Sequence, residues 1–166
     1  MSPPSTIAKA EIIAALRAHI ANDLAAATAS QQATQAGATH EESRPENDKD
    51  TRALESTYLA RGLAQRVAEL QTAASQLANL LIRPFRDDES VSLSALVTVQ
   101  DDHGRLRHYF IAPCGGGVKL QVSGGEVSVV TPASPLGHAL LGKRADDEVQ
   151  LRTARGPANM VISDIR

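Results

Sequence analysis

The sequence predicts an α+β protein, with an N-terminal antiparallel α-helical coiled-coil hairpin followed by a small β-sheet domain that has one short helix. Composition changes midway: residues 1–82 contain 20 Ala and 2 Gly, whereas residues 83–166 contain 7 Ala and 9 Gly. Alanine favours helices and glycine favours turns. We therefore predict two domains, 1–82 and 83–166. Heptad-like spacing in the first and short apolar runs in the second support this division.

The first helix is predicted from about residue 6 to residue 36. Ser5 or Thr6 can cap it, and the apolar residues that follow have helical spacing: Ile13, Leu16, Ile20, Leu24 and Ala27. Gly37 is the predicted end of this helix. At about 1.5 Å per residue, such a helix is roughly 45 Å long.

The second helix can begin at Asp50 or Thr51, and Pro84 ends it because proline is excluded from a helix interior. Its apolar positions alternate at spacings of four and three, as in the a/d seam of a coiled coil: Leu63, Val67, Leu70, Ala74, Leu77 and Leu81. Extended backwards, this seam reaches the small residues Ala60, Ser56 and Ala53. Small side chains let two helices approach closely.

The connection between the helices contains residues 41–50, which we call the acidic tip. It holds five carboxylates and two basic residues. Pro45 places the connection between about Gly37 and Asp48, so the helices form an antiparallel hairpin; an intermolecular coiled coil is the alternative. The acids either stabilise the start of the second helix through its dipole or share a divalent ion, since Mg²⁺ takes oxygen ligands.

The second half alternates apolar runs with turn residues, which predicts strands at 91–100, 106–112, 118–122, 127–131, 149–153 and 159–165. Ser134 followed by Pro135 is an N-cap with proline at the first helical position, so a helix of two turns should end near Gly142. The glycine loop at Pro113–Gly117 is predicted to be a turn. A phosphate loop would need a following helix, and a strand follows instead.

Charge and cysteine content limit the possible functions. The net charge is −2, and residues 83–166 carry ten basic and ten acidic residues, so no concentrated positive face for nucleic acid is evident. A protein partner is therefore expected. Cys114 is the single cysteine, which excludes an intramolecular disulfide and a cysteine metal site. No signal peptide or membrane span is indicated, and we expect a cytoplasmic protein.

Four stretches of the second half carry a family likeness: Val129–Pro132, Ser134–Gly137, Leu140–Lys143 and Asp146–Val149. A Ser-Pro pair, a short helix ending in Gly-Lys, an acidic turn and a strand follow one another. In this, the C-terminal half resembles the C-terminal domain of the GreA/GreB family of bacterial transcription elongation factors. The N-terminal half is similar in architecture, and Glu46–Asn47 matches the Glu-Asn pair of the family's tip motif. The segment Asp50–Ala60 resembles a divergent branch of these proteins.

This resemblance implies an FKBP-like domain whose sheet wraps partly around the helix near 135–141. It also implies docking of that domain at the rim of the secondary channel of RNA polymerase, with the coiled coil passing down the channel and contacting nascent RNA indirectly. Family carboxylates at the tip help to hold a second Mg²⁺, which activates water for cleavage of backtracked RNA. Glu42 and Glu46 are then the candidate catalytic residues and Mg²⁺ ligands, with Asp48 as a further ligand. No stably bound cofactor and no stand-alone enzyme are expected.

The tip departs from the family pattern Asp-Leu-Ser/Lys-Glu-Asn. With Glu46–Asn47 aligned, Ser43 stands where the aspartate belongs, and Arg44 adds a positive charge that opposes metal binding. Two hypotheses follow: a factor that stimulates RNA cleavage, and a secondary-channel regulator that does not. A prolyl isomerase or chaperone is disfavoured because it needs an aromatic-lined pocket, and the chain has only four aromatic residues: Tyr58, Phe85, Tyr109 and Phe110.

Overall fold

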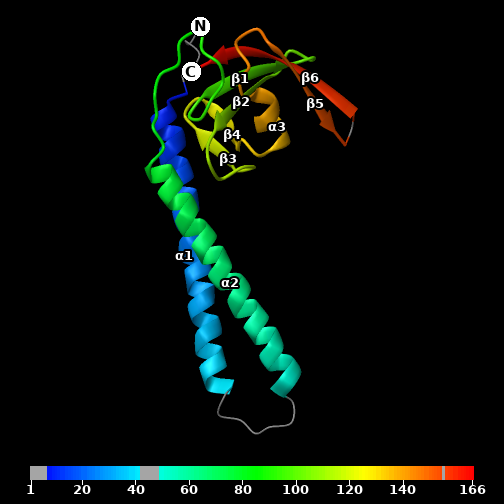
Figure 1. Ribbon diagram of the computed structural model, residues 1–166. Helices are drawn as coiled ribbons and strands as arrows, with labels where there is room; N and C mark the ends of the chain where they lie inside the picture. The colour runs from blue at the N-terminus through cyan, green and yellow to red at the C-terminus, as the bar shows by residue number, and fades with distance from the viewer. Residues whose placement is uncertain (1–6, 42–48, 155) are drawn as a thin grey trace. The chain divides into compact units, whose positions relative to one another are not determined.

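The computed structural model describes residues 7–41, 49–154 and 156–166 (Figure 1). Two long helices are followed by a six-stranded mixed sheet and one short helix, which confirms the predicted fold class. The elements are α1 (Lys9–Glu41), α2 (Lys49–Ala78), β1 (Leu96–Asp101), β2 (Leu106–Ile111), β3 (Lys119–Val122), β4 (Gly125–Val130), α3 (Pro135–Leu140), β5 (Glu148–Thr153) and β6 (Gly156–Ile165).

The chain forms two compact units. One, which we call the sheet unit, joins Met1–Arg17 with Gln76–Arg166, and the other, which we call the hairpin arm, is Ala18–Ser75. The start of α1 and the end of α2 thus belong to the same unit as the sheet. These units are defined by packing, and the division of the sequence into 1–82 and 83–166 stays a prediction.

The sheet has the strand order β3-β4-β2-β1-β6-β5. Strands β2 and β4 are parallel, and the other neighbours are antiparallel. A tight turn joins β1 to β2, where the Asp101 carboxylate accepts hydrogen bonds from the backbone N–H groups of His103 (2.9 Å) and Arg105 (3.0 Å). The bond from Arg105 in particular holds the pKa of Asp101 below its usual value.

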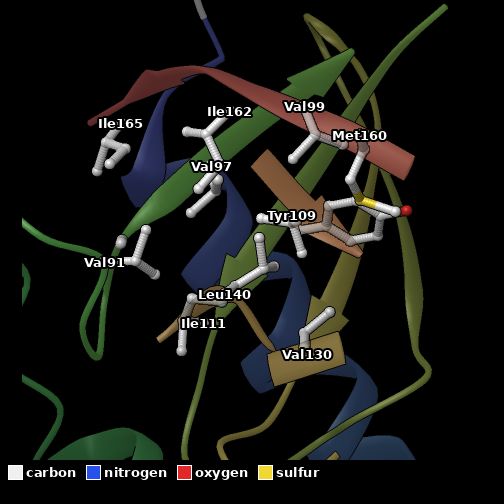
Figure 2. Packing of buried hydrophobic residues seen from close by; sticks show 12 residues of the cluster. Val91, Val97, Val99, Tyr109, Ile111, Val130, Leu140, Met160, Ile162 and Ile165 are labelled. Carbon is white, nitrogen blue, oxygen red and sulfur yellow. The ribbon is translucent and has the colours of Figure 1, made fainter. Parts of the chain in front are cut away.

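One face of the sheet packs against α3. Leu140 lies among alternate residues of the strands, including Val97, Ile111 and Ile162, and all four are fully buried (Figure 2). Because successive strand residues point to opposite faces, the neighbouring residues Leu96, Phe110 and Val129 lie on the other face, and they are buried too. Three fully buried residues of the helix ends belong to the same unit: Ile12, Leu16 and Leu77.

Helix α3 begins as the sequence predicts. The Ser134 hydroxyl accepts a hydrogen bond from the N–H of Gly137 (3.1 Å) and donates one to the carbonyl of Thr131 (2.8 Å), while Pro135 occupies the first turn. A Cβ atom at Gly137 would lie 1.9 Å from the Thr131 carbonyl oxygen, so only glycine fits there. Gly142 follows the helix with a φ of +78°.

Both long helices differ from the predicted bounds. Helix α1 continues through Gly37 to Glu41, because a single glycine costs only about 1 kcal/mol in a helix rich in alanine. Helix α2 begins at Lys49 and ends at Ala78, well before the predicted end at Pro84. The predicted seam residue Leu81 therefore lies beyond the helix, where it is 84% exposed.

The end of α2 coincides with a contact between the helices. The Arg17 guanidinium donates a hydrogen bond to the Leu77 carbonyl at 3.0 Å, satisfying one of the carbonyls left open at a helix C-terminus. The predicted strand at 91–100 also starts later, at Leu96. Ser94 is buried with a φ of +69°, which interrupts the extended conformation just before that strand.

Candidate functional site

Helix α2 buries the alternating seam that the sequence predicts. The α2 residues at spacings of four and three are partly or fully buried: Ser56, Ala60, Leu63, Val67, Leu70, Ala74 and Leu77. Ala53, the last position of the backward extension, is exposed. Asp23 of α1 forms an ion pair with Arg66 of α2 at 3.8 Å, and the two helices lie side by side (Figure 1).

The seam changes character toward the acidic tip. Ile20, Val67 and Leu70 form its buried apolar part, whereas the partly buried positions nearer the tip are small or polar: Gln31 and Thr34 of α1 and Ser56 and Ala60 of α2. The large apolar residues of this part of α2 lie outside, with Leu54, Tyr58 and Leu59 at 57%, 65% and 58% exposed. The arm near the tip therefore has little apolar burial to stabilise it.

In the sequence, the acidic tip spans the connection between the two long helices. Helix α1 ends at Glu41 and α2 begins at Lys49, so residues 42–48 connect them. Glu42, Glu46 and Asp48 lie outside the described residues. Their roles as catalytic residues and Mg²⁺ ligands stay predictions. The structure does describe the helices that precede and follow this segment, which have 33 and 30 residues.

Elsewhere in the described part of the chain, no group of three or more His, Cys, Asp or Glu residues is placed to hold a metal ion. His108 instead contacts a neighbouring strand: its Nδ1 lies 3.0 Å from the Thr98 hydroxyl, and burial lowers its pKa. Burial also raises the pKa of the Cys114 thiol. Neither long helix, over its described residues, is apolar enough to cross a membrane.

The aromatic residues are distributed in a way that does not suit a prolyl isomerase. Tyr109 packs in the core (Figure 2). Phe110 is fully buried, and Phe85 carries two cations over its ring. Tyr58 lies on the hairpin arm. A surface groove of about 570 Å³ beside β2 and β4 has Tyr109 as its one aromatic lining residue. Neither Phe85 nor Phe110 lines this groove.

Sequence reasoning missed the contacts that attach the start of α1 within the sheet unit. The Glu11 carboxylate accepts hydrogen bonds from the backbone N–H (2.9 Å) and the hydroxyl (2.8 Å) of Ser123, which is 112 residues away. Leu16 lies under the glycine loop, where a Cβ atom at Gly115 would be 2.8 Å from its Cδ1. Gly115 is also in a left-handed turn conformation, with a φ of +76°. The loop is thus a turn, as predicted, and its glycine accommodates a helix residue.

Comparisons with known proteins agree with the likeness of the second half. The family described as "Transcription elongation factor, GreA/GreB, C-term" matches residues 86–166. Transcription elongation factor GreA of Syntrophobacter fumaroxidans is 30% identical over 88 residues, which make up 52% of this chain and 53% of that protein. The chain thus spans about half the length of this curated relative.

Two solved structures are similar over more of the chain. Gfh1, the GreA factor homolog 1 of Thermus thermophilus, has a TM-score of 0.38 and 20% identity, covering 94% of this chain and 93% of that one. A GreA/GreB elongation factor from Nitrosomonas europaea has a TM-score of 0.37 and 18% identity, covering 71% and 94%. Residues 86–166 thus match the C-terminal domain of the GreA/GreB family of transcription elongation factors.

Proposed function

We propose that this chain is a transcription elongation factor that binds RNA polymerase at its secondary channel and carries the acidic tip toward the active centre. One observation carries this proposal: a segment that matches the GreA/GreB C-terminal domain follows two long helices, and the acidic tip at residues 41–50 between them holds five carboxylates. The family match of residues 86–166 indicates what kind of partner to expect. The hairpin supplies a means of presenting charge to another molecule's site.

The hairpin arm has dimensions that suit insertion into a channel. It consists of two helices alone, each roughly 10–12 Å across with its side chains. The partly buried seam residues near the tip, among them Ser56 and Ala60, are small. In this proposal the two helices of the arm carry the tip carboxylates to the partner's site.

The donor set of the tip fits a magnesium ion shared with the polymerase. Carboxylate oxygens are the ligands that Mg²⁺ prefers, and one or two protein carboxylates suffice when another molecule supplies the rest. Glu42 and Glu46 would hold the ion, with Asp48 as a further ligand. When bound, such an ion lowers the pKa of water and so supplies a nucleophile for RNA cleavage. The role of this chain is to bring the carboxylates to the reacting site.

A second candidate function is a regulator that binds the channel without stimulating cleavage. It is favoured by Ser43, which stands at the aspartate position of the family tip, and by the adjacent positive charge of Arg44. A serine hydroxyl cannot replace an anionic ligand. In this case the tip acids would perturb the active centre or compete for its metal.

The deciding experiment measures RNA cleavage in purified backtracked elongation complexes. With the wild-type protein we expect faster cleavage, and with Glu42→Ala or Glu46→Ala we expect that acceleration to fall at least tenfold, as loss of an ion ligand requires. Glu55→Ala is the matched control, because it removes one exposed carboxylate of α2 outside the tip. No acceleration by the wild type would exclude the cleavage function. Equal acceleration by all variants would exclude the residue assignment.

Binding is measured separately, by co-migration of the intact chain with RNA polymerase on a sizing column. Binding without acceleration supports the second candidate function, and absence of binding excludes both. Ser43→Asp then restores the missing anionic ligand. If Ser43 is what prevents cleavage, this variant should accelerate cleavage at least tenfold over the wild type while binding the polymerase equally well. No gain would show that the serine is not the cause.

A further inference from the structure

The strand β5 lies at one edge of the sheet that the described residues form. In the strand order β3-β4-β2-β1-β6-β5, it pairs with β6 on one side only (Figure 1). It has six residues, among them neither the proline nor the lysine that often protects an edge strand. The opposite edge, β3, has four residues and begins with Lys119, which is paired with Glu126 at 3.1 Å. Of the two edges, β5 is therefore the more suitable for pairing with another strand.

The backbone groups of β5 point outward from the sheet at alternate residues. In an antiparallel pair, facing residues alternate between pairs that exchange both hydrogen bonds and pairs that exchange none. The Asp147 carbonyl, just before β5, accepts a hydrogen bond from the N–H of Ile162 at 3.0 Å. Arg152 faces Pro157, which has no N–H to donate. Both observations indicate that odd-numbered residues bond to β6. The even-numbered residues then direct their backbone N–H and C=O groups outward: Glu148, Gln150 and Arg152.

The side chains of β5 are complementary to a second copy of the same strand. If two copies lie antiparallel with their Gln150 residues facing each other, Glu148 of each copy faces Arg152 of the other. Val149 of each copy likewise faces Leu151 of the other. Glu148 and Arg152 are on the exposed face of the sheet, whereas Val149 and Leu151 pack with the core. Each such opposite-charge or apolar pair stabilises a sheet by about 0.2–1 kcal/mol.

Neighbouring registers lack this complementarity. A shift by one residue would place core-side side chains beside solvent-side ones. A shift of the centre by one residue along each strand, to Val149 or Leu151, would place Gln150 opposite Glu148 or Arg152, and no ion pair would form within β5. The register about Gln150 is thus specified by charge as well as by the alternation of faces.

We propose that β5 is a self-association surface, at which the β5 strands of two copies of this chain pair antiparallel about Gln150. The outward N–H and C=O groups of the even-numbered residues supply the hydrogen bonds, and the two ion pairs fix the register. A single strand pair is smaller than the interfaces of about 1,200–2,000 Å² that stable complexes bury, so the dimer is weak. The inference does not rest on the proposed function, because β5 and all its contacts lie in the sheet unit.

Sedimentation of the intact chain measures association from about 10 µM to about 1 mM, a range chosen because small interfaces associate weakly. We expect the average mass to rise toward that of a dimer and no further, since the pairing uses the β5 edge of both copies. A chain that stays monomeric across this range would overturn the proposal and leave β5 to a strand of another protein. Species larger than a dimer would overturn it as well.

Hydrogen exchange at both concentrations locates the surface. The amide of Gln150 should exchange severalfold more slowly at the higher concentration, because it donates to the second copy. The amides of Val149 and Leu151 should change less, since they already donate to β6 within one copy. Protection gained elsewhere in the described chain but not at Gln150 would contradict the assignment to β5.

Charge reversal tests the register. Glu148→Arg and Arg152→Glu each place like charges opposite one another at both ion pairs, so each variant alone should associate about tenfold more weakly. An equimolar mixture of the two variants should regain association, because every facing pair then joins opposite charges. Both side chains are exposed, so the fold of one copy should tolerate either change. Wild-type association by both single variants, or a mixture no better than either alone, would overturn the register.

Glu55→Arg is the matched control, because it makes the same charge change on an exposed residue of α2, outside the sheet. It should associate as the wild type does. Equal weakening by Glu55→Arg and Glu148→Arg would show that net charge, and not the β5 edge, governs association.

Discussion

The two ends of the long helices bury different kinds of residue. Where the helices belong to the sheet unit, Ile12, Leu16 and Leu77 are completely buried. Near the acidic tip the seam contains serine, alanine, glutamine and threonine, and the large residues Tyr58 and Leu59 lie outside. The same pair of helices is thus a core element at one end and a lightly packed arm at the other.

This difference assigns stability mainly to the sheet unit and contacts with a partner to the arm. Burial of apolar side chains is the main favourable term in folding, so the sheet unit supplies most of the stability of the described chain. The arm near the tip relies on helix propensity and small side chains. Changes there should leave the sheet unit folded and alter only what the arm contacts.

The largest effect is expected from Gly137→Ala in the sheet unit. The new methyl group would meet the Thr131 carbonyl oxygen at 1.9 Å, and a backbone atom cannot move aside as the end of a side chain can. We expect a loss of at least about 4 kcal/mol in the free energy of unfolding, measured by urea denaturation. A loss below about 1 kcal/mol would show that α3 shifts freely on the sheet.

The comparison is tested directly by the pair Leu16→Ala and Leu59→Ala. Leu16 is fully buried beside the glycine loop, and its truncation should lower the free energy of unfolding by about 3 kcal/mol. Leu59 is 58% exposed, and its truncation should change the free energy of unfolding by less than about 0.5 kcal/mol. Similar losses for the two variants would remove the distinction between core end and arm.

A smaller effect of opposite sign is expected in the arm from Gly62→Ala. Gly62 lies inside α2, and a Cβ atom there would meet nothing within 4 Å. The substitution should stabilise α2 by about 0.5–1 kcal/mol, because alanine has the higher helix propensity. Slower hydrogen exchange of the neighbouring amides of α2 would show this stabilisation. Faster exchange would mean that α2 contacts another group at this position.

The smallest effect concerns the pH dependence of the sheet unit. The pKa of Lys9 is about 8 in the folded chain and 10.5 for an ordinary lysine, so between these values the unfolded chain holds more protons. The free energy of unfolding should therefore gain a contribution that rises with pH across this range. Lys9→Met should remove that rise when urea midpoints are compared at pH 7.5 and 9.5. Identical pH profiles would show that Lys9 keeps an ordinary pKa.

The sequence was sufficient for features that depend on local spacing. The alternation from Ser56 to Leu77 correctly predicted the buried side of α2, because a seam depends on helical periodicity alone. Ser134 and Pro135 likewise predicted the start of α3, since a cap needs only its own neighbours. The resemblance of the second half was carried by these same residues, and the comparison over residues 86–166 confirms it.

Features that depend on distant contacts could not be predicted. The hydrogen bond from Arg17 to the Leu77 carbonyl joins residues 60 apart in the sequence. The residues next to Leu77 carry no sequence signal that predicts the end of α2 there. The parallel pairing of β2 with β4 is equally invisible in either strand alone. For the acidic tip, the sequence gives the donor types, while the roles of Glu42, Glu46 and Asp48 depend on a partner and stay predictions.

The alternating seam of α2 also makes the length of the arm adjustable in fixed steps. Because the pattern of buried positions repeats every seven residues, inserting one heptad in each helix preserves the inward-facing side of both. Each such step lengthens the arm by about 10 Å, whereas an insertion in one helix alone would shift every pair of facing residues. The length of the hairpin arm can thus change by whole heptads during evolution while the sheet unit stays the same.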